Sequence, residues 1–223
     1  MRISIVVPAL NEAEQIEATL LPLQPLRARG HELILSDGCS ADGTLARAKP
    51  WVDRLVQSPR GRAMQMNQGA QAATGDLLLF LHADTQLPEN TEALLREFWQ
   101  SDKFWGRFDV RLSGKHPAFR LIAWLMNWRS RLTGIATGDQ AIFVRRMAFE
   151  QIGGFPALPL MEDIAISRLL KRQSRPFCIR TPLVTSSRRW ETHGILRTIL
   201  LMWWLRLQFF CGVAPERLAR LYR

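Results

Sequence analysis

The sequence predicts an α/β domain whose central sheet is mostly parallel and flanked by helices, with a C-terminal helical extension. Three observations predict it. Short, near-continuous apolar runs alternate with helical segments, as in parallel sheets buried on both faces. Polar clusters follow the apolar runs, at the strand ends where such sheets bind ligands. The 223 residues, 47% hydrophobic and 22% charged, suit one well-packed domain and exclude disordered, collagen-like and tandem-domain chains.

The expected elements follow in a regular order. In the first half, β-branched and apolar runs predict strands at residues 3–7, 32–36, 54–56 and 76–81, and helical periodicity predicts helices at 12–28, 42–49 and 62–73. From residue 104 the alternation loosens, and we expect strands at 104–112 and 141–144 and helices at 118–131 and 164–171. Because no repeat or linker interrupts the chain, we expect one domain over residues 1–193. Residues 194–223 would form the extension, packed on the domain or at a membrane surface.

The net charge of +10 is a property of the C-terminal part. Up to residue 163 there are 18 basic and 18 acidic residues, whereas residues 164–223 hold 12 basic and 2 acidic ones. The basic segment adjoins the most apolar stretch of the chain, residues 194–213. This combination indicates an anionic membrane surface more than a nucleic acid, so no nucleic-acid partner is expected. Ordinary packing and an anionic ligand are the alternatives.

The apolar stretch has the period of a helix with one broad apolar face. That face comprises Leu196, Ile199, Leu200, Trp203, Leu207, Phe210 and Cys211. Arginines at 197 and 206 disfavour a helix that spans a bilayer, so we expect one that lies at an interface or packs on the sheet.

The sequence also predicts a cytoplasmic location, either free or peripheral on the inner face of the membrane. The first apolar run leads directly into Asn11 and Glu12 without a cleavage site. The three cysteines are far apart and in no ligand spacing, which fits a reducing compartment.

Two polar segments at strand ends are candidates for nucleoside binding. Residues 37–44 place two carboxylates and two hydroxyls around glycines, groups that can hydrogen-bond a nucleoside. We favour that role for Asp37, whereas Asp42 more readily caps the amides that open the next helix. Arg62 follows Gly61 at a helix start, where amides and a guanidinium suit a phosphate, and an ordinary surface arginine is the alternative.

Carboxylates recur after later elements. Asp84 follows the strand expected at 76–81, and one or two such carboxylates together with phosphates often hold Mg²⁺ or Mn²⁺. A turn or capping role is the alternative for it. Glu162 and Asp163 open a helix, where acids complement the helix dipole or, at the mouth of a cleft, act as a general base.

Two further clusters are suited to sugars and phosphates. Gly138, Asp139 and Gln140 offer donors and acceptors for sugar hydroxyls. Arg188, Arg189 and Trp190 join two cations to an aromatic platform that could hold a diphosphate or stack on a sugar.

In this order the segments resemble glycosyltransferase family 2, the inverting nucleotide-sugar transferases of the GT-A fold. Residues 7–12 (VPALNE) are similar to the family's V-P-x-x-N-E, residues 37–44 (DGCSADGT) to its D-x-x-S-x-D-x-T, and residues 82–84 to its D-x-D region. The G-D-Q, E-D and R-W elements at 138–140, 162–163 and 189–190 follow in the family's order. The residues within these motifs are most similar to those of a small bacterial branch, whose members are named radical-SAM/selenodomain-associated transferase 2 or arsenosugar-biosynthesis glycosyltransferase.

The resemblance implies a role for each matching position. The donor nucleotide would contact Pro8, Glu12, Asp37, Arg62, Arg189 and Trp190. The acceptor and sugar would contact Gly138, Asp139, Gln140 and Glu162. Asp84 would hold Mg²⁺ or Mn²⁺, and Asp163 would be the base. The donor would be a nucleoside-diphosphate sugar, with UDP as the expected nucleotide, and the acceptor a small molecule or a lipid.

The chain departs from the family pattern at two positions. His82 replaces the first acid of D-x-D, which leaves Asp84 as the carboxylate for the metal. Ser186 stands where polymerising members have the Gln of Q-x-x-R-W, which disfavours a processive synthase. The rival functions are a sugar nucleotidyltransferase and a non-catalytic membrane-associated protein. A dinucleotide-dependent oxidoreductase is disfavoured because no G-x-G-x-x-G follows the first strand.

Overall fold

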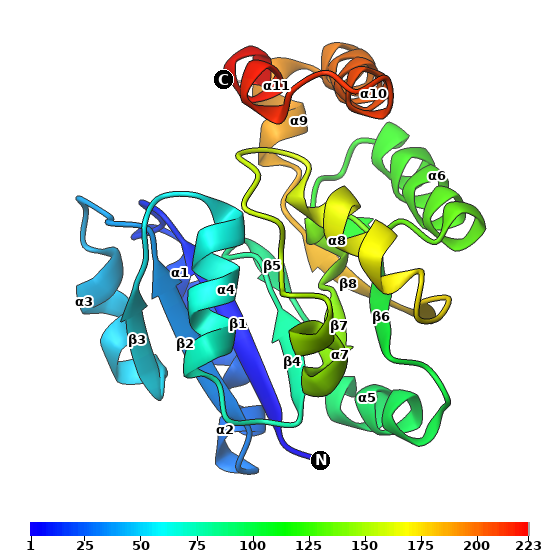
Figure 1. The fold of residues 1–223 in the computed structure, drawn as a ribbon. Coiled ribbons are helices and arrows are strands. Elements are labelled where there is room, and N and C mark those ends of the chain that lie inside the picture. The colour runs from blue at the N-terminus through cyan, green and yellow to red at the C-terminus, as the bar shows by residue number, and fades with distance from the viewer. Residues whose placement is uncertain (223) are drawn as a thin grey trace.

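The protein is built on one eight-stranded sheet (Figure 1). The structure is a computed structural model that describes residues 1–222. The strand order is β3-β2-β1-β4-β7-β6-β8-β5. The strands are β1 (Ile3–Ala9), β2 (Glu32–Asp37), β3 (Arg54–Gln57), β4 (Leu77–Phe80), β5 (Thr85–Gln86), β6 (Trp105–Leu112), β7 (Phe143–Arg145) and β8 (Phe177–Thr185). Strands β1 to β4 run parallel, as do β6 and β8, while β7 and β5 run antiparallel to their neighbours. The expected α/β class with a mostly parallel sheet is confirmed.

Helices cover both faces of this sheet (Figure 1). They are α1 (Ile16–Leu20), α2 (Gln24–Ala28), α3 (Thr44–Ala48), α4 (Arg62–Ala72), α5 (Thr91–Gln100), α6 (Ala118–Thr133), α7 (Arg146–Gln151), α8 (Glu162–Leu170), α9 (Arg188–His193), α10 (Ile195–Phe210) and α11 (Pro215–Tyr222), with 3₁₀ turns η1 (Leu21–Leu23), η2 (Lys49–Trp51) and η3 (Gly138–Gln140). Alternate residues of β1 divide the core. Ile5 and Val7 pack with α1, α2, α5 and α6, whereas Val6 packs with α4, α7 and α8.

Two expected elements differ from the sequence-based expectation because of proline. The helix expected at 12–28 is broken into α1, η1 and α2, because Pro22 and Pro25 each stand at the start of a new helical segment. Strand β8 was not expected, because Pro182 interrupts its apolar pattern. Pro182 pairs next to the register shift between Phe108 and Asp109, the kind of irregularity where a sheet tolerates proline.

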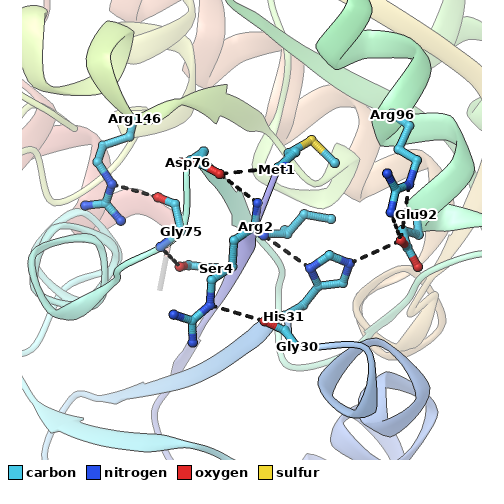
Figure 2. Close-up of polar contacts among 11 residues, drawn as sticks. Met1, Arg2, Ser4, Gly30, His31, Gly75, Asp76, Glu92, Arg96 and Arg146 are labelled. Atoms are coloured by element: carbon cyan, nitrogen blue, oxygen red, sulfur yellow. Dashed lines mark hydrogen bonds and ion pairs between the residues drawn. The ribbon is translucent and has the colours of Figure 1, made fainter.

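Polar contacts fix the edge of the sheet where β1 and β4 begin (Figure 2). The Arg2 amide donates to the Asp76 carboxylate at 2.7 Å, and the Gly75 amide donates to the Ser4 hydroxyl at 2.8 Å. Arg146 Nε donates to the Gly75 carbonyl at 2.7 Å, which ties α7 to the same corner. These contacts make a rigid base at the edge opposite the carboxyl ends of β1 and β4.

A buried charged triad ties β6 to α6. Arg107, which is 0% exposed, and Arg131 both donate to the carboxylate of Asp109. The side-chain amide of Asn127 in α6 makes two hydrogen bonds with the backbone of Val110 in β6. It donates to the Val110 carbonyl at 3.0 Å and accepts from the Val110 amide at 2.8 Å. Helix α6 is therefore held firmly against the sheet.

The last long helix, α10, points its apolar face outward. Gly194, at φ 83°, separates α9 from α10, and the buried side chains of α10 are Thr198 and Leu205. The face expected from periodicity is the exposed one, with Leu196 at 70% and Trp203 at 65% exposed. The stretch does form a helix, but its broad apolar face is not the face that packs on the domain. No helix within residues 1–222 is long and apolar enough to cross a membrane.

Candidate active site

The loops after β1 and β2 lock together at the carboxyl edge of the sheet. The Asn11 amide donates to the Ser40 hydroxyl at 2.9 Å, and the Ala41 amide donates to Asn11 Oδ1 at 2.9 Å. Asn11 adopts the left-handed conformation with φ 56°, which asparagine tolerates better than most residues. Asp42 accepts from the Thr44 amide at 3.0 Å at the start of α3, so its expected capping role is confirmed.

Pro8 and Asp37 lie beneath these loops rather than on their surface. Pro8 is buried in β1 opposite Ser36 of β2. Asp37 is 0% exposed, and its carboxylate accepts from both the amide and the hydroxyl of Ser40. In this arrangement Asp37 shapes the β2–α3 loop, and its contact with a nucleoside stays a prediction.

Three charged groups, Glu12, Asp84 and Arg188, lie near one another where β1 and β4 end. The pKa of Glu12 is raised, mainly by burial. The nearby charge of Arg188 opposes this effect, and that of Asp84 adds to it. Asp84 is half-buried and accepts from Thr85 Oγ1 at 3.3 Å. The structure thus brings Glu12 and Asp84 together, as expected, and places Arg188, one of the two cations of the cluster at residues 188–190, near Glu12.

Asp84 suits a divalent cation that is shared with a phosphorylated ligand. Its contact with Thr85 is long and leaves oxygens free, which are the donors that Mg²⁺ and Mn²⁺ prefer. Within the described residues, no group of three or more His, Cys, Asp or Glu side chains could hold a metal by itself. The chemistry therefore fits an ion held by one carboxylate together with ligand oxygens.

His82, in the place of the family's first acid, is a neutral group in the same loop. Burial and then the charge of Arg62 lower its pKa to about 3, so the imidazole stays uncharged at physiological pH. It lies against Gly138, where an added Cβ would stand 2.5 Å from His82 Nε2. Only a residue without a side chain allows this approach.

Helix α8 begins with the expected pair of acids. Asp163 Oδ2 accepts from the Gly138 amide at 3.0 Å, and Oδ1 accepts from the Ile164 amide at 2.7 Å. Glu162 is 5% exposed, and burial together with neighbouring Asp163 raises its pKa to about 7, against the opposing charge of Arg62. With this pKa, Glu162 gains or loses a proton near neutral pH, which is a property suited to acid–base chemistry.

Arg62 is the cation common to these acids. Although burial alone would lower its pKa, nearby Glu162, Tyr222, Asp163 and Asp84 raise it. It is the first residue of α4 and follows Gly61, which has φ 131°. A guanidinium at a helix start, between a metal-type carboxylate and an acid pair, fits a phosphate.

The turn η3 carries the three residues expected at the acceptor. Gln140 is 0% exposed, and its Oε1 accepts from the Thr137 amide at 3.1 Å, so Gln140 caps this turn. Burial raises the pKa of Asp139, whose Oδ1 is sealed from solvent and unpaired among the described residues. Gly138 and Asp139 lie beside Asp163, while acceptor contact by Gln140 stays a prediction.

Comparison with known proteins identifies the family. The model of "Glycosyl transferase family 2" matches residues 4–153. The chain belongs to glycosyltransferase family 2. A PGL/p-HBAD biosynthesis glycosyltransferase of Mycobacterium bovis is 32% identical over 169 residues, 68% of this chain and 62% of that protein. An uncharacterized glycosyltransferase of Haemophilus influenzae is 30% identical over 195 residues, covering 81% of this chain and 66% of its own. The chain thus spans less than two thirds of the mycobacterial protein, and the arsenosugar and radical-SAM branch stays a prediction.

Solved structures confirm the expected GT-A fold. A mannosyltransferase from Pyrobaculum calidifontis in complex with GDP-Man and Mn²⁺ has a TM-score of 0.64 at 23% identity, covering 83% of this chain and 56% of its own. Glucosyl-3-phosphoglycerate synthase from Mycobacterium tuberculosis with Mn²⁺, UDP and phosphoglyceric acid has a TM-score of 0.64 at 20% identity, covering 95% and 79%. At these identities the likeness shows the fold alone.

The R-W element of this family 2 chain contacts α11 and an apolar cluster. Arg189 Nη2 donates to the Tyr222 carbonyl at 3.1 Å, and its guanidinium stacks 3.7 Å from the centre of the Tyr222 ring. Trp190 packs with the cluster that includes Phe119 and Ile122, between α6 and α10. In this arrangement α11 and the apolar cluster engage the two residues, and their contact with the diphosphate stays a prediction.

Proposed function

We propose that the protein is an inverting, metal-assisted and non-processive glycosyltransferase that moves a sugar from a nucleoside-diphosphate sugar to an acceptor hydroxyl. One observation carries this proposal. Asp84 and the Glu162–Asp163 pair all lie close enough to Arg62 to raise its pKa, at the carboxyl edge of the sheet. In this set Asp84 is a carboxylate that could hold a metal ion, Arg62 is a cation that could bind a phosphate, and Asp163 is the candidate base. The complexes of GT-A neighbours with UDP or GDP-Man and Mn²⁺ support a nucleotide donor and a divalent ion.

In the proposed reaction Asp163 accepts the proton of the acceptor hydroxyl. The Gly138 amide, 3.0 Å from Asp163 Oδ2, fixes the orientation of that carboxylate. As the proton leaves, the acceptor oxygen bonds to the anomeric carbon from the face opposite the nucleotide, and the bond to the diphosphate oxygen breaks with its electron pair. The configuration at that carbon inverts. Arg62 stabilises the charge on the departing diphosphate.

Asp84 would hold the divalent ion, Mg²⁺ or Mn²⁺. When bound, the ion supplies positive charge that stabilises the departing diphosphate. The neutral His82 adds no charge to this loop, so the ion would depend on one carboxylate of the protein together with ligand oxygens. Ser186, in place of the glutamine of polymerising relatives, supports transfer of a single sugar.

The first experiment is isothermal titration of UDP, GDP and dTDP, each with and without Mn²⁺ or Mg²⁺. We expect metal-dependent binding of one nucleotide, with UDP the expected one, and loss of the metal dependence in Asp84→Ala. Asp102→Ala, at an exposed carboxylate, is the control and should bind as the wild type does. Asp163→Asn should keep nucleotide binding and lose transfer. Unchanged turnover in that variant would remove Asp163 from the mechanism, and no nucleotide binding at all would refute the function.

We also propose that the C-terminal third contacts an anionic membrane surface. The outward face of α10 supports this, since Leu200 and Leu207 are both 59% exposed. The test is co-sedimentation with anionic vesicles at two salt concentrations. Binding at low salt that weakens at high salt is expected. Absence of binding at low salt would refute it.

A further inference from the structure

A groove between α6 and α10 has a volume of about 260 Å³. Its apolar walls are Ile122, Leu125, Met126 and Trp128 of α6, Ile199, Met202 and Trp203 of α10, and Trp190. Figure 1 shows α10 lying alongside α6 at the C-terminal end of the molecule. A water molecule occupies about 30 Å³ in the liquid, so the groove has room for a hydrocarbon segment. Of its lining residues, Asp139 and Trp190 belong to motifs considered above, whereas the α6 and α10 residues do not.

One part of the groove is cationic. Arg129 of α6 and Arg206 of α10 both line it, together with Asp139. Arg129 Nε and Nη2 are sealed from solvent and unpaired among the described residues. Burial and the nearby charge of Arg206 lower the pKa of Arg129 to about 10. Buried donors without partners are costly, and an anion between two guanidiniums would satisfy them.

The cationic part adjoins the candidate base. Asp139 follows Gly138 directly, and the Gly138 amide holds Asp163 at 3.0 Å. Asp163 is also among the charges that act on Arg129. A molecule anchored at the two guanidiniums therefore reaches the proposed acceptor side of the site.

The apolar surface continues outside the groove along both helices. On α6, Leu121 and Trp124 are 59% and 57% exposed, and Trp124 stacks on Trp128 of the groove wall. On α10, Leu196 is 70% exposed. A contiguous apolar surface beside a cationic groove fits a hydrocarbon ligand with an anionic group.

We propose that the α6–α10 groove holds the hydrocarbon chain of the acceptor, and that Arg129 and Arg206 bind an anionic group attached to that chain. The inference rests on the proposed glycosyl transfer and names its acceptor class as an anionic amphiphile. Trp203 and Leu125 contact the chain, while the hydroxyl to be glycosylated lies toward Asp163.

The test is direct binding of decyl phosphate, decanol and inorganic phosphate to the full chain, each below the concentration at which micelles form. We expect decyl phosphate to bind at least roughly tenfold more tightly than either fragment, because chain and charge act together. Trp203→Ala should weaken decyl phosphate binding by roughly tenfold or more. Trp204→Ala, on the same helix but outside the groove, is the matched control and should change it less than about twofold.

A second pair of variants tests the charge. Arg206→Gln should reduce decyl phosphate binding to the level of decanol and leave decanol binding unchanged. Arg197→Gln, on α10 but outside the groove, is its control. If Trp203→Ala does not fold, Leu125→Ala repeats the test of the apolar wall, and Leu132→Ala, also on α6, is its control. Equal losses in groove and control variants, or equal binding of decyl phosphate and decanol, would overturn the proposal.

Nucleotide titration on the same samples separates the two proposals. Metal-dependent nucleotide binding without decyl phosphate binding would overturn the groove inference and leave glycosyl transfer standing. Decyl phosphate binding without nucleotide binding would overturn the acceptor role, because the protein would then bind no donor from which a sugar could be transferred.

Discussion

Replacing Glu162 by glutamine should stabilise the fold, by an amount that grows as pH rises from about 5 to 7 and is then constant. Burial and Asp163 raise the pKa of Glu162 from 4.5 to about 7. Between these two values the folded state keeps a proton that the unfolded state has released, so the free energy of unfolding falls as pH rises. The difference corresponds to about 3 kcal/mol above pH 7. A glutamine side chain cannot ionise, so the variant avoids this loss.

The assay is urea denaturation of wild type and Glu162→Gln at pH 5, 6, 7 and 8, without divalent ions. The two proteins should have nearly equal stability at pH 5, and the variant should gain up to about 3 kcal/mol by pH 8. Glu14→Gln, at an exposed position, is the control and should follow the wild type at every pH. Stability curves for Glu162→Gln and wild type that stay parallel from pH 5 to pH 8 would refute the assigned ionisation.

Two other predictions concern the core and the metal loop. Asp109→Ala should lower the free energy of unfolding by about 3 kcal/mol, because it leaves the fully buried guanidinium of Arg107 without its counter-charge. A loss below about 1 kcal/mol in urea denaturation, as for a surface pair, would contradict a buried triad. His82→Asp should tighten Mn²⁺ binding by roughly tenfold in the presence of nucleotide, because it adds a second carboxylate beside Asp84. Titration that shows equal or weaker Mn²⁺ binding would place the ion away from this loop.

The parts of the fold set by local pattern could be predicted from sequence. The apolar runs of β1, β2 and β4 marked a parallel sheet, and since parallel strands end at one edge, Glu12 and Asp84 were expected to meet. Periodicity identified α10 as a helix but could not say which face packs, because part of the partner surface, on α8, is distant in sequence. The short strand β5 and helix α7 were missed because neither carries a long periodic signal.

The same limit applies to the candidate site. Glu162 and Asp163 stood out as adjacent acids at a helix start, and the structure brings them to Arg62. Arg129 and Arg206 did not stand out as a ligand site, because they lie on different helices and belong to no common motif. Their significance comes from the approach of α6 and α10, which no local motif records. Arg189 was assigned to the diphosphate, but α11 engages it through a contact that depends on the last helical turn.

Tyr222, stacked on Arg189, offers a built-in spectroscopic reporter. It is the single tyrosine of the 223-residue chain, so fluorotyrosine labelling would place one ¹⁹F nucleus beside that guanidinium. Aromatic ring currents and a facing cation make such a resonance sensitive to the stacking geometry. The ¹⁹F resonance would then show, in solution and without a substrate assay, whether Arg189 stays stacked on Tyr222 of α11 when a nucleotide binds.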